Sequence, residues 1–120
     1  MIADRAELER IAGAELVFPG LEDARAGIWS ANALLVAIGA PRLREVGLEL
    51  PPDAQMPADP ELRLHKLLRE EHGRDAYGRY RSLLRRLVRF EHGLDRLLGR
   101  ALRDAASRQA DRPAGSPSGL

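Results

Sequence analysis

The chain has 120 residues, of which 44% are hydrophobic and 31% are charged, a balance typical of one globular domain with a single core. It contains no cysteine, which excludes disulfides, thiol nucleophiles and cysteine-ligated zinc sites. No apolar run reaches the roughly 18 residues that span a bilayer, and the first residues are acidic rather than signal-like. We therefore expect a cytoplasmic protein without membrane contact.

The net charge of +1 conceals an uneven distribution along the chain. Residues 1–59 hold 5 arginines against 10 acidic residues, whereas residues 60–120 hold 14 basic residues against 8 acidic ones, so the two parts carry −5 and +6. Opposite charges of this size predict that the two halves dock on each other, or on the matching half of a second subunit.

Apolar residues recur at helical spacing in every periodic segment, and no segment alternates as a strand does. The expected helices cover residues 3–17, 20–39, 42–46, 60–72 and 76–106. Phe18-Pro19-Gly20 separates the first two helices, and four prolines within residues 48–60 predict an extended crossover. Asn32 lies in the middle of the second apolar face, where a buried amide would fix helix packing or face a small polar pocket. These patterns predict an all-α fold, a bundle of four main helices with a Pro-rich crossover and a long C-terminal amphipathic helix.

Local signals define the ends of the later helices. Asp59 and Pro60 are suited to the N-cap and the first turn of the helix over 60–72, and Gly73 is suited to its C-terminal end. From Ser107 onward the composition is that of a disordered tail. We expect a single helical domain over 1–106 and a disordered tail over 107–120.

A stripe of basic residues runs along the helix expected at 76–106. At 100° per residue, seven of them share about a third of the circumference: Arg81, Arg85, Arg89, His92, Arg96, Arg100 and Arg103. Such a row repels itself unless an anion lies across it. The six arginines are therefore the candidate anion- or partner-binding residues, and the anion is the acidic half of the chain, a second subunit or RNA.

The same helix predicts self-association. Thirty residues of helix are about 45 Å long, whereas the neighbouring helices have roughly 15 to 20 residues. Part of the apolar stripe cannot be covered within one chain, and an exposed apolar stripe usually marks an interface. We expect a homodimer.

Glu91 lies within the apolar arc of this helix, between Leu84 and Leu87. A carboxylate placed there should be partly buried, and burial requires an arginine partner or a raised pKa. A structural ion pair across the bundle is the interpretation we favour over a general base.

The three histidines do not form a recognisable metal motif. Glu71-His72-Gly73 and Glu91-His92-Gly93 repeat twenty residues apart, but helix geometry separates the two histidines by roughly 25 Å. Helical di-metal sites use Glu-x-x-His, which does not occur here, and Glu61 with His65 would bind a metal only weakly. We expect neither a metal nor another cofactor.

One enzyme-like pattern is present. Arg85 and Arg86 precede His92 by seven and six residues. This spacing resembles the Arg-x(4–6)-His active-site pattern of HEPN ribonucleases, small helical dimers of toxin–antitoxin and defence systems. The resemblance implies that these residues would act on an RNA phosphodiester in a cleft between subunits.

The sequence thus supports two functions of different classes. The first is a small cytoplasmic interaction module without enzymatic activity, which self-associates and has a protein partner. The alternative is a HEPN-type RNA-binding protein or ribonuclease that uses Arg85, Arg86 and His92.

Overall fold

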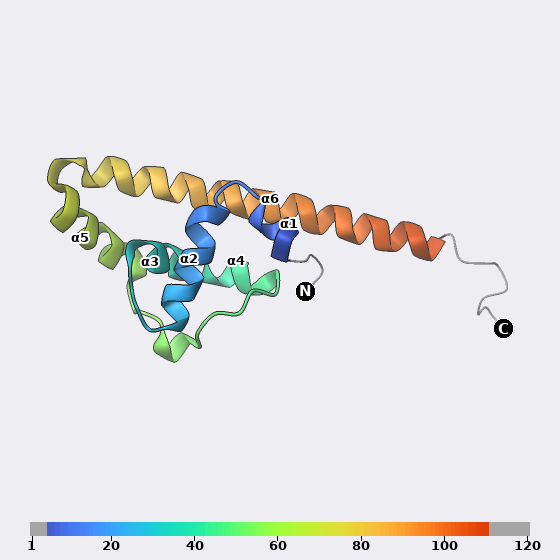
Figure 1. Ribbon diagram of the computed structural model, residues 1–120, viewed down its shortest axis with the longest axis horizontal. Coiled ribbons are helices and arrows are strands. Elements are labelled where there is room, and N and C mark those ends of the chain that lie inside the picture. Colours follow the sequence, from blue (N-terminus) through green and yellow to red (C-terminus); the bar gives the residue numbers. More distant parts are fainter. Residues whose placement is uncertain (1–4, 111–120) are drawn as a thin grey trace.

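The computed structural model of the chain describes residues 5–110, which are helical with connecting turns and contain no strand. The predicted all-α class is therefore confirmed for this range. Figure 1 shows α2 to α5 gathered on one side of the long helix α6, whose C-terminal end projects beyond them. The elements in chain order are α1 (Arg5–Glu9), α2 (Ala14–Arg25), α3 (Ala31–Ile38), α4 (Ala40–Glu45), η1 (Asp53–Gln55), α5 (Pro60–His72), η2 (Gly73–Asp75) and α6 (Ala76–Ala110).

The N-terminal region forms α1, a turn and the start of α2, so the single helix expected over 3–17 is wrong. The turn ends at Gly13, whose φ of 97° is the left-handed conformation that glycine tolerates best. A Cβ atom at Gly13 would lie 2.7 Å from the carbonyl oxygen of Arg86 and 2.9 Å from Cβ of Phe90. The helix is interrupted here because the chain is pressed directly onto the backbone of α6.

The second correction concerns Pro19, which lies inside α2 rather than at a break. Proline removes one backbone hydrogen bond from a helix interior, a cost of about 3 kcal/mol. Burial of Val17, Phe18 and Leu21 on one side of α2 compensates for it. On the same helix, a Cβ atom at Gly20 would lie 2.4 Å from the backbone oxygen of Asn32, so α2 and α3 cross in backbone contact.

The helix expected over 20–39 is divided into α2 and α3, and Asn32 therefore lies half-buried in a first turn rather than in the middle of a helix. Ser30 begins α3, because its hydroxyl accepts a hydrogen bond from the Ala33 N–H at 3.2 Å and donates one to Asp23 at 2.7 Å. Ser30 is therefore an ordinary N-cap of α3. The sequence prediction missed it because the apolar periodicity of residues 20–39 favoured one continuous helix.

The segment from α4 to α5 follows the sequence prediction more closely. α4 begins two residues before the predicted helix, and α5 has the predicted bounds 60–72. Asp59 precedes α5 without a capping hydrogen bond from its side chain, contrary to expectation; its carbonyl oxygen accepts from the Arg63 N–H instead. Arg44 of α4 binds the segment that connects the two helices. It donates to the carbonyl oxygen of Pro51 and to the carboxylate of Asp53, each at 2.6 Å.

The core lies where α2, α3 and α5 meet the first part of α6. Its most deeply buried large side chains are Phe90, Leu21, Leu34, Leu35, Leu43, Leu64, Val17 and Val36. α6 is 35 residues long, about 52 Å, and it continues through residues 107–110, which the sequence prediction assigned to the tail. The rest of that predicted tail, residues 111–120, lies outside the described residues. None of the described helices is both long and apolar enough to cross a membrane.

Candidate interaction face on the C-terminal helix

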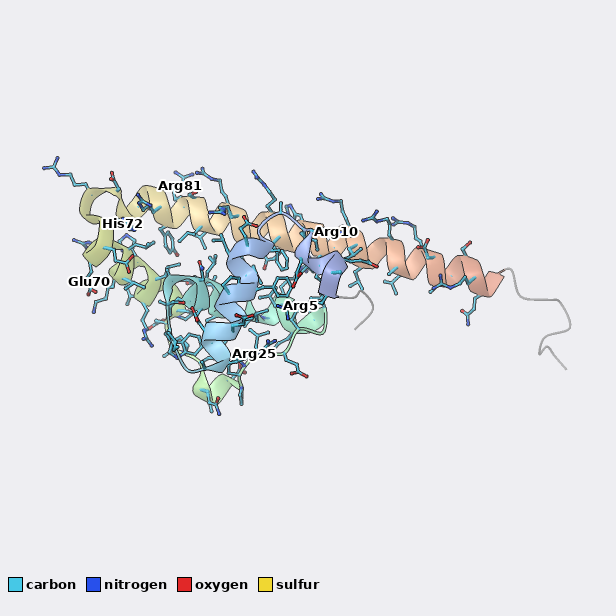
Figure 2. All side chains as sticks on the ribbon, viewed as in Figure 1. Arg5, Arg10, Arg25, Glu70, His72 and Arg81 are labelled. Atoms are coloured by element: carbon cyan, nitrogen blue, oxygen red, sulfur yellow. The ribbon has the colours of Figure 1, made fainter. Side chains whose placement is uncertain are left out.

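The basic stripe occupies the face of α6 that points away from the core. Leu87, Phe90 and Leu94 are buried on the opposite side of the helix. The stripe's seven side chains, Arg81, Arg85, Arg89, His92, Arg96, Arg100 and Arg103, are all exposed. In Figure 2, the labelled Arg81 lies on the side of α6 that faces away from α5. The stripe is therefore a continuous outer surface of the folded chain.

Within residues 5–110, none of the stripe's arginines forms an ion pair. Within this range, the stripe therefore forms no ion pair with the chain's own acidic half, which is one of the three anions that the sequence left open. Two other ion pairs join the halves, Arg86 with Glu15 and Arg42 with Asp95. In the second pair the arginine comes from the acidic half and the aspartate from the basic half, so its charges are opposite to the net charges of the two halves.

Arg86 lies beside the stripe but not on it. Its Nη2 atom lies 2.7 Å from Oε1 of Glu15 at the start of α2. The hydrogen bond from Arg86 lowers the pKa of the Glu15 carboxyl, helped by backbone hydrogen bonds and opposed by partial burial. Arg86 thus links α6 to α2, and it is directed away from the face that carries Arg85.

An apolar border runs along the N-terminal half of the stripe. A shallow depression of about 430 Å³ is lined by Leu84 and Val88 together with Arg81, Arg85, Arg89 and His92. Val88 is 44% exposed and Tyr77, one turn before Arg81, is 62% exposed. The guanidinium carbon of Arg81 lies 5.9 Å from the centre of the Tyr77 ring, within the range of a cation–π contact.

A second hollow, of about 580 Å³, lies where α1 and the turn after it approach α6. Its lining combines apolar side chains with three arginines and two carboxylates, and its residues are Glu7, Arg10, Ile11, Ala12, Gly93, Arg96, Leu97, Arg100, Ala101 and Asp104. The sequence prediction missed this hollow because its two sides come from segments more than 80 residues apart. Gly93 permits the approach, since a Cβ atom there would lie 2.2 Å from Cγ2 of Ile11.

Glu91 is half-buried, as predicted, and faces the junction of α3 and α4. A Cβ atom at Gly39 would lie 3.5 Å from Oε2 of Glu91. Burial raises the pKa of the Glu91 carboxyl; Arg42 opposes this rise and Asp95 adds to it. Arg42 itself pairs with Asp95, and with Glu45 at 3.9 Å, so the direct arginine partner expected for Glu91 is absent among the described residues.

The three histidines lie in different surroundings. The rings of His65 and Tyr80 meet edge-on with their centres 5.7 Å apart. At the end of α5, Nε2 of His72 lies 3.6 Å from Oε2 of Glu71. His92 is exposed on the stripe. Over the range 5–110, no three histidine or carboxylate side chains lie together in a way that could hold a metal ion.

The residues of the ribonuclease-like pattern are only partly brought together. Arg85 and His92 share the outer face of α6, two turns and about 10 Å apart along the axis. Arg86 is bound to Glu15 on another side of the helix. No family model matches the chain, and no curated protein and no solved structure match it significantly.

Proposed function

We propose that the protein is a cytoplasmic interaction module without enzymatic activity, which self-associates through the projecting end of α6. The observation that carries this proposal is the surface of α6 beyond Leu97. Leu98 and Ala101 are only half-buried there, Ala105 is exposed and Leu102 is 56% exposed. An apolar surface that the chain's own core does not cover favours an interface.

The apolar side chains of this end form one face. At 100° per residue, Leu98, Ala101, Leu102 and Ala105 span about 100° of the circumference around the direction of the buried Leu94. The neighbouring basic residues, Arg96, Arg100 and Arg103, lie on the other side of the helix. A helix packed against the apolar face therefore does not meet the basic stripe.

A second copy of this chain fits the face because the pattern is self-complementary. In an antiparallel pair with its two-fold axis between positions 101 and 102, each leucine opposes an alanine. Leu98 then lies against Ala105 of the partner subunit, and Ala101 lies against Leu102 of the partner subunit. Large residues opposite small ones pack without voids, and a two-fold contact closes the assembly as a dimer. Within each subunit, we propose a four-helix bundle whose main helices are α2, α3, α5 and the first part of α6, and whose crossover is the Pro-rich segment 48–60 that leads into α5.

Sedimentation velocity at micromolar concentration tests this proposal. Wild-type protein should sediment as a dimer, and Leu98→Glu with Leu102→Glu should convert it to a monomer with an unchanged helical circular dichroism spectrum. Leu62→Glu is the matched control, because Leu62 is 60% exposed on α5 and lies away from this face. A wild-type monomer, or a dimer that survives both glutamates, would refute the proposal.

A second candidate function is a HEPN-type ribonuclease. One observation favours it: Arg85 and His92 share an exposed face of α6. The position of Arg86, bound to Glu15, counts against it. Incubation of the dimer with single-stranded RNA tests it: cleavage that His92→Ala abolishes would support the enzyme, and intact RNA would support the interaction module.

A further inference from the structure

We propose that the basic stripe of α6 binds a single-stranded nucleic acid, whose phosphates contact the arginines and whose bases rest on the apolar border. This inference is independent of self-association, because the stripe and the apolar face of residues 98–105 lie on opposite sides of the helix. It rests on three features: a row of charges that forms no ion pair within residues 5–110, the apolar surface beside that row, and the pairing of several of the chain's own acids.

The row of charges matches a linear polyanion. From Arg81 to Arg103 it spans 22 residues, about 33 Å of helix. Of the acids in the same stretch, Glu91 projects from the core side of α6. Asp95 and Asp104 flank the stripe and line hollows together with Arg96 and Arg100, and Asp95 is bound by Arg42. α2 to α5 lie on one side of α6 (Figure 1), and within residues 5–110 no acidic side chain forms an ion pair with an arginine of the stripe. A strand of phosphates relieves the mutual repulsion and releases its own counterions.

The apolar border favours a strand with unpaired bases. Leu84 and Val88 line the depression together with the basic side chains, and the exposed ring of Tyr77 lies beside Arg81, the first arginine of that lining. Unpaired bases stack on aromatic side chains and on guanidinium planes. A duplex hides the faces of its bases, and an anionic lipid headgroup has no flat aromatic group to place there.

The acidic half of a second copy is a weaker match for the stripe. Its carboxylates are largely occupied within their own chain. Arg5 contacts Glu9 and Glu22, Arg86 binds Glu15, and Ser30 binds Asp23. Docking on the stripe would compete with these contacts for the same carboxylates.

Fluorescence anisotropy with a labelled oligouridylate of about 12 nucleotides tests the proposal. If three or four phosphates are contacted, the log–log slope of affinity against salt should be about −2 to −3, since each contributes about −0.7. Affinity should then fall about 20- to 50-fold between about 50 and 200 mM KCl. An oligothymidylate of equal length distinguishes RNA from DNA as the source of the strand.

Two variants separate the phosphate contacts from the base contacts. Arg85→Glu with Arg89→Glu should abolish binding, whereas Arg69→Glu with Arg74→Glu, the same charge change on exposed residues away from the stripe, should leave most of it. Tyr77→Ala should weaken binding about fivefold or more without changing the salt slope, because stacking is not ionic. Circular dichroism confirms that each variant is folded.

Several results would overturn the proposal. Absence of binding at about 50 mM KCl would remove it entirely. Equal affinity for a duplex of the same length, for polyglutamate or for phosphatidylglycerol vesicles would show a general anion surface rather than a single-strand site. Equal loss of binding in the Arg69→Glu, Arg74→Glu control would show that only net charge matters. None of these results changes the sedimentation test of the dimer.

Discussion

Arg86 of α6 binds Glu15 of α2 through a hydrogen bond of 2.7 Å, while its neighbour Arg85 faces solvent. Adjacent arginines on one helix therefore have different roles. Arg86 connects the two oppositely charged parts of the chain, and Arg85 belongs to the outer stripe. Helix geometry turns successive side chains by 100°, which is enough to separate an internal contact from an external surface.

The Arg86–Glu15 pair should contribute little to stability, because both side chains are more than a third exposed. Arg86→Ala and Glu15→Gln should each cost at most about 1 kcal/mol at pH 7. The pKa of Glu15 is lowered in the folded chain, so its contribution is present above the ordinary value of 4.5 and disappears as pH falls through the lowered value. Urea unfolding at pH 7 and at pH 3 measures this, and a double-mutant cycle should show weaker coupling at pH 3 than at pH 7. Coupling that does not decrease as pH falls would contradict it.

Glu91 should show the opposite dependence on pH. Burial raises its pKa in the folded state, so the folded chain retains a proton that the unfolded chain has released, and stability falls as pH rises from 4.5 through the raised value. The Glu91→Gln variant has no charge to bury and avoids this loss of stability. The melting temperature of the variant at pH 7 should equal or slightly exceed that of the wild type.

Asp95→Asn is the control for Glu91, since Asp95 is the carboxylate that Arg42 binds directly. It should be neutral or mildly destabilising, by less than about 1 kcal/mol. Thermal melts at pH 5 and pH 7 distinguish the two residues. A large loss of stability in Glu91→Gln at pH 7 would indicate a direct ion pair that the described residues do not contain.

Gly20→Ala should be strongly destabilising. The added Cβ atom would lie 2.4 Å from the backbone oxygen of Asn32, and backbone cannot move aside as a flexible side chain can. We expect a loss of about 2 to 4 kcal/mol in urea unfolding. Gly78→Ala on α6 is the matched control. An added Cβ atom meets nothing within 4 Å there, so the change should stabilise the helix by about 0.5 to 1 kcal/mol. Equal effects of the two changes would mean that α2 and α3 are not in contact at this point.

Ser30→Ala should destabilise the chain by about 0.5 to 2 kcal/mol, because it removes the acceptor that caps the Ala33 N–H at the start of α3. Ser82→Ala, in the interior of α6, should be neutral or slightly stabilising, since alanine has the higher helix propensity. Chemical unfolding of both variants checks this. A neutral Ser30→Ala would support one continuous helix through residues 26–30.

Local sequence signals predicted the ends of a helix correctly where the residues at those ends themselves favour a first turn or a termination. Pro60 and Gly73 mark α5 correctly, because proline favours a first turn and Gly73 adopts the positive φ of 57° at the C-terminal end. Local rules failed at Pro19 and Gly13. Burial of one side of α2 outweighs the lost hydrogen bond at Pro19, and contact with α6 interrupts an otherwise helical pattern at Gly13. Both outcomes depend on residues far away in the sequence.

By itself, the sequence determined the all-α class, the bounds of α5 and the alignment of seven basic residues on one face of α6, since all three follow from the helical repeat and from the chemistry of single residues. Tertiary structure alone decided that this face points outward and that Glu15 takes Arg86 but no arginine of the stripe. It also decided that Glu91 is half-buried beside Gly39 and has no direct ion-pair partner within residues 5–110. Periodicity states which residues share a face, but only the packing of distant segments states what that face meets, because the free energy of burial depends on the neighbour as much as on the residue.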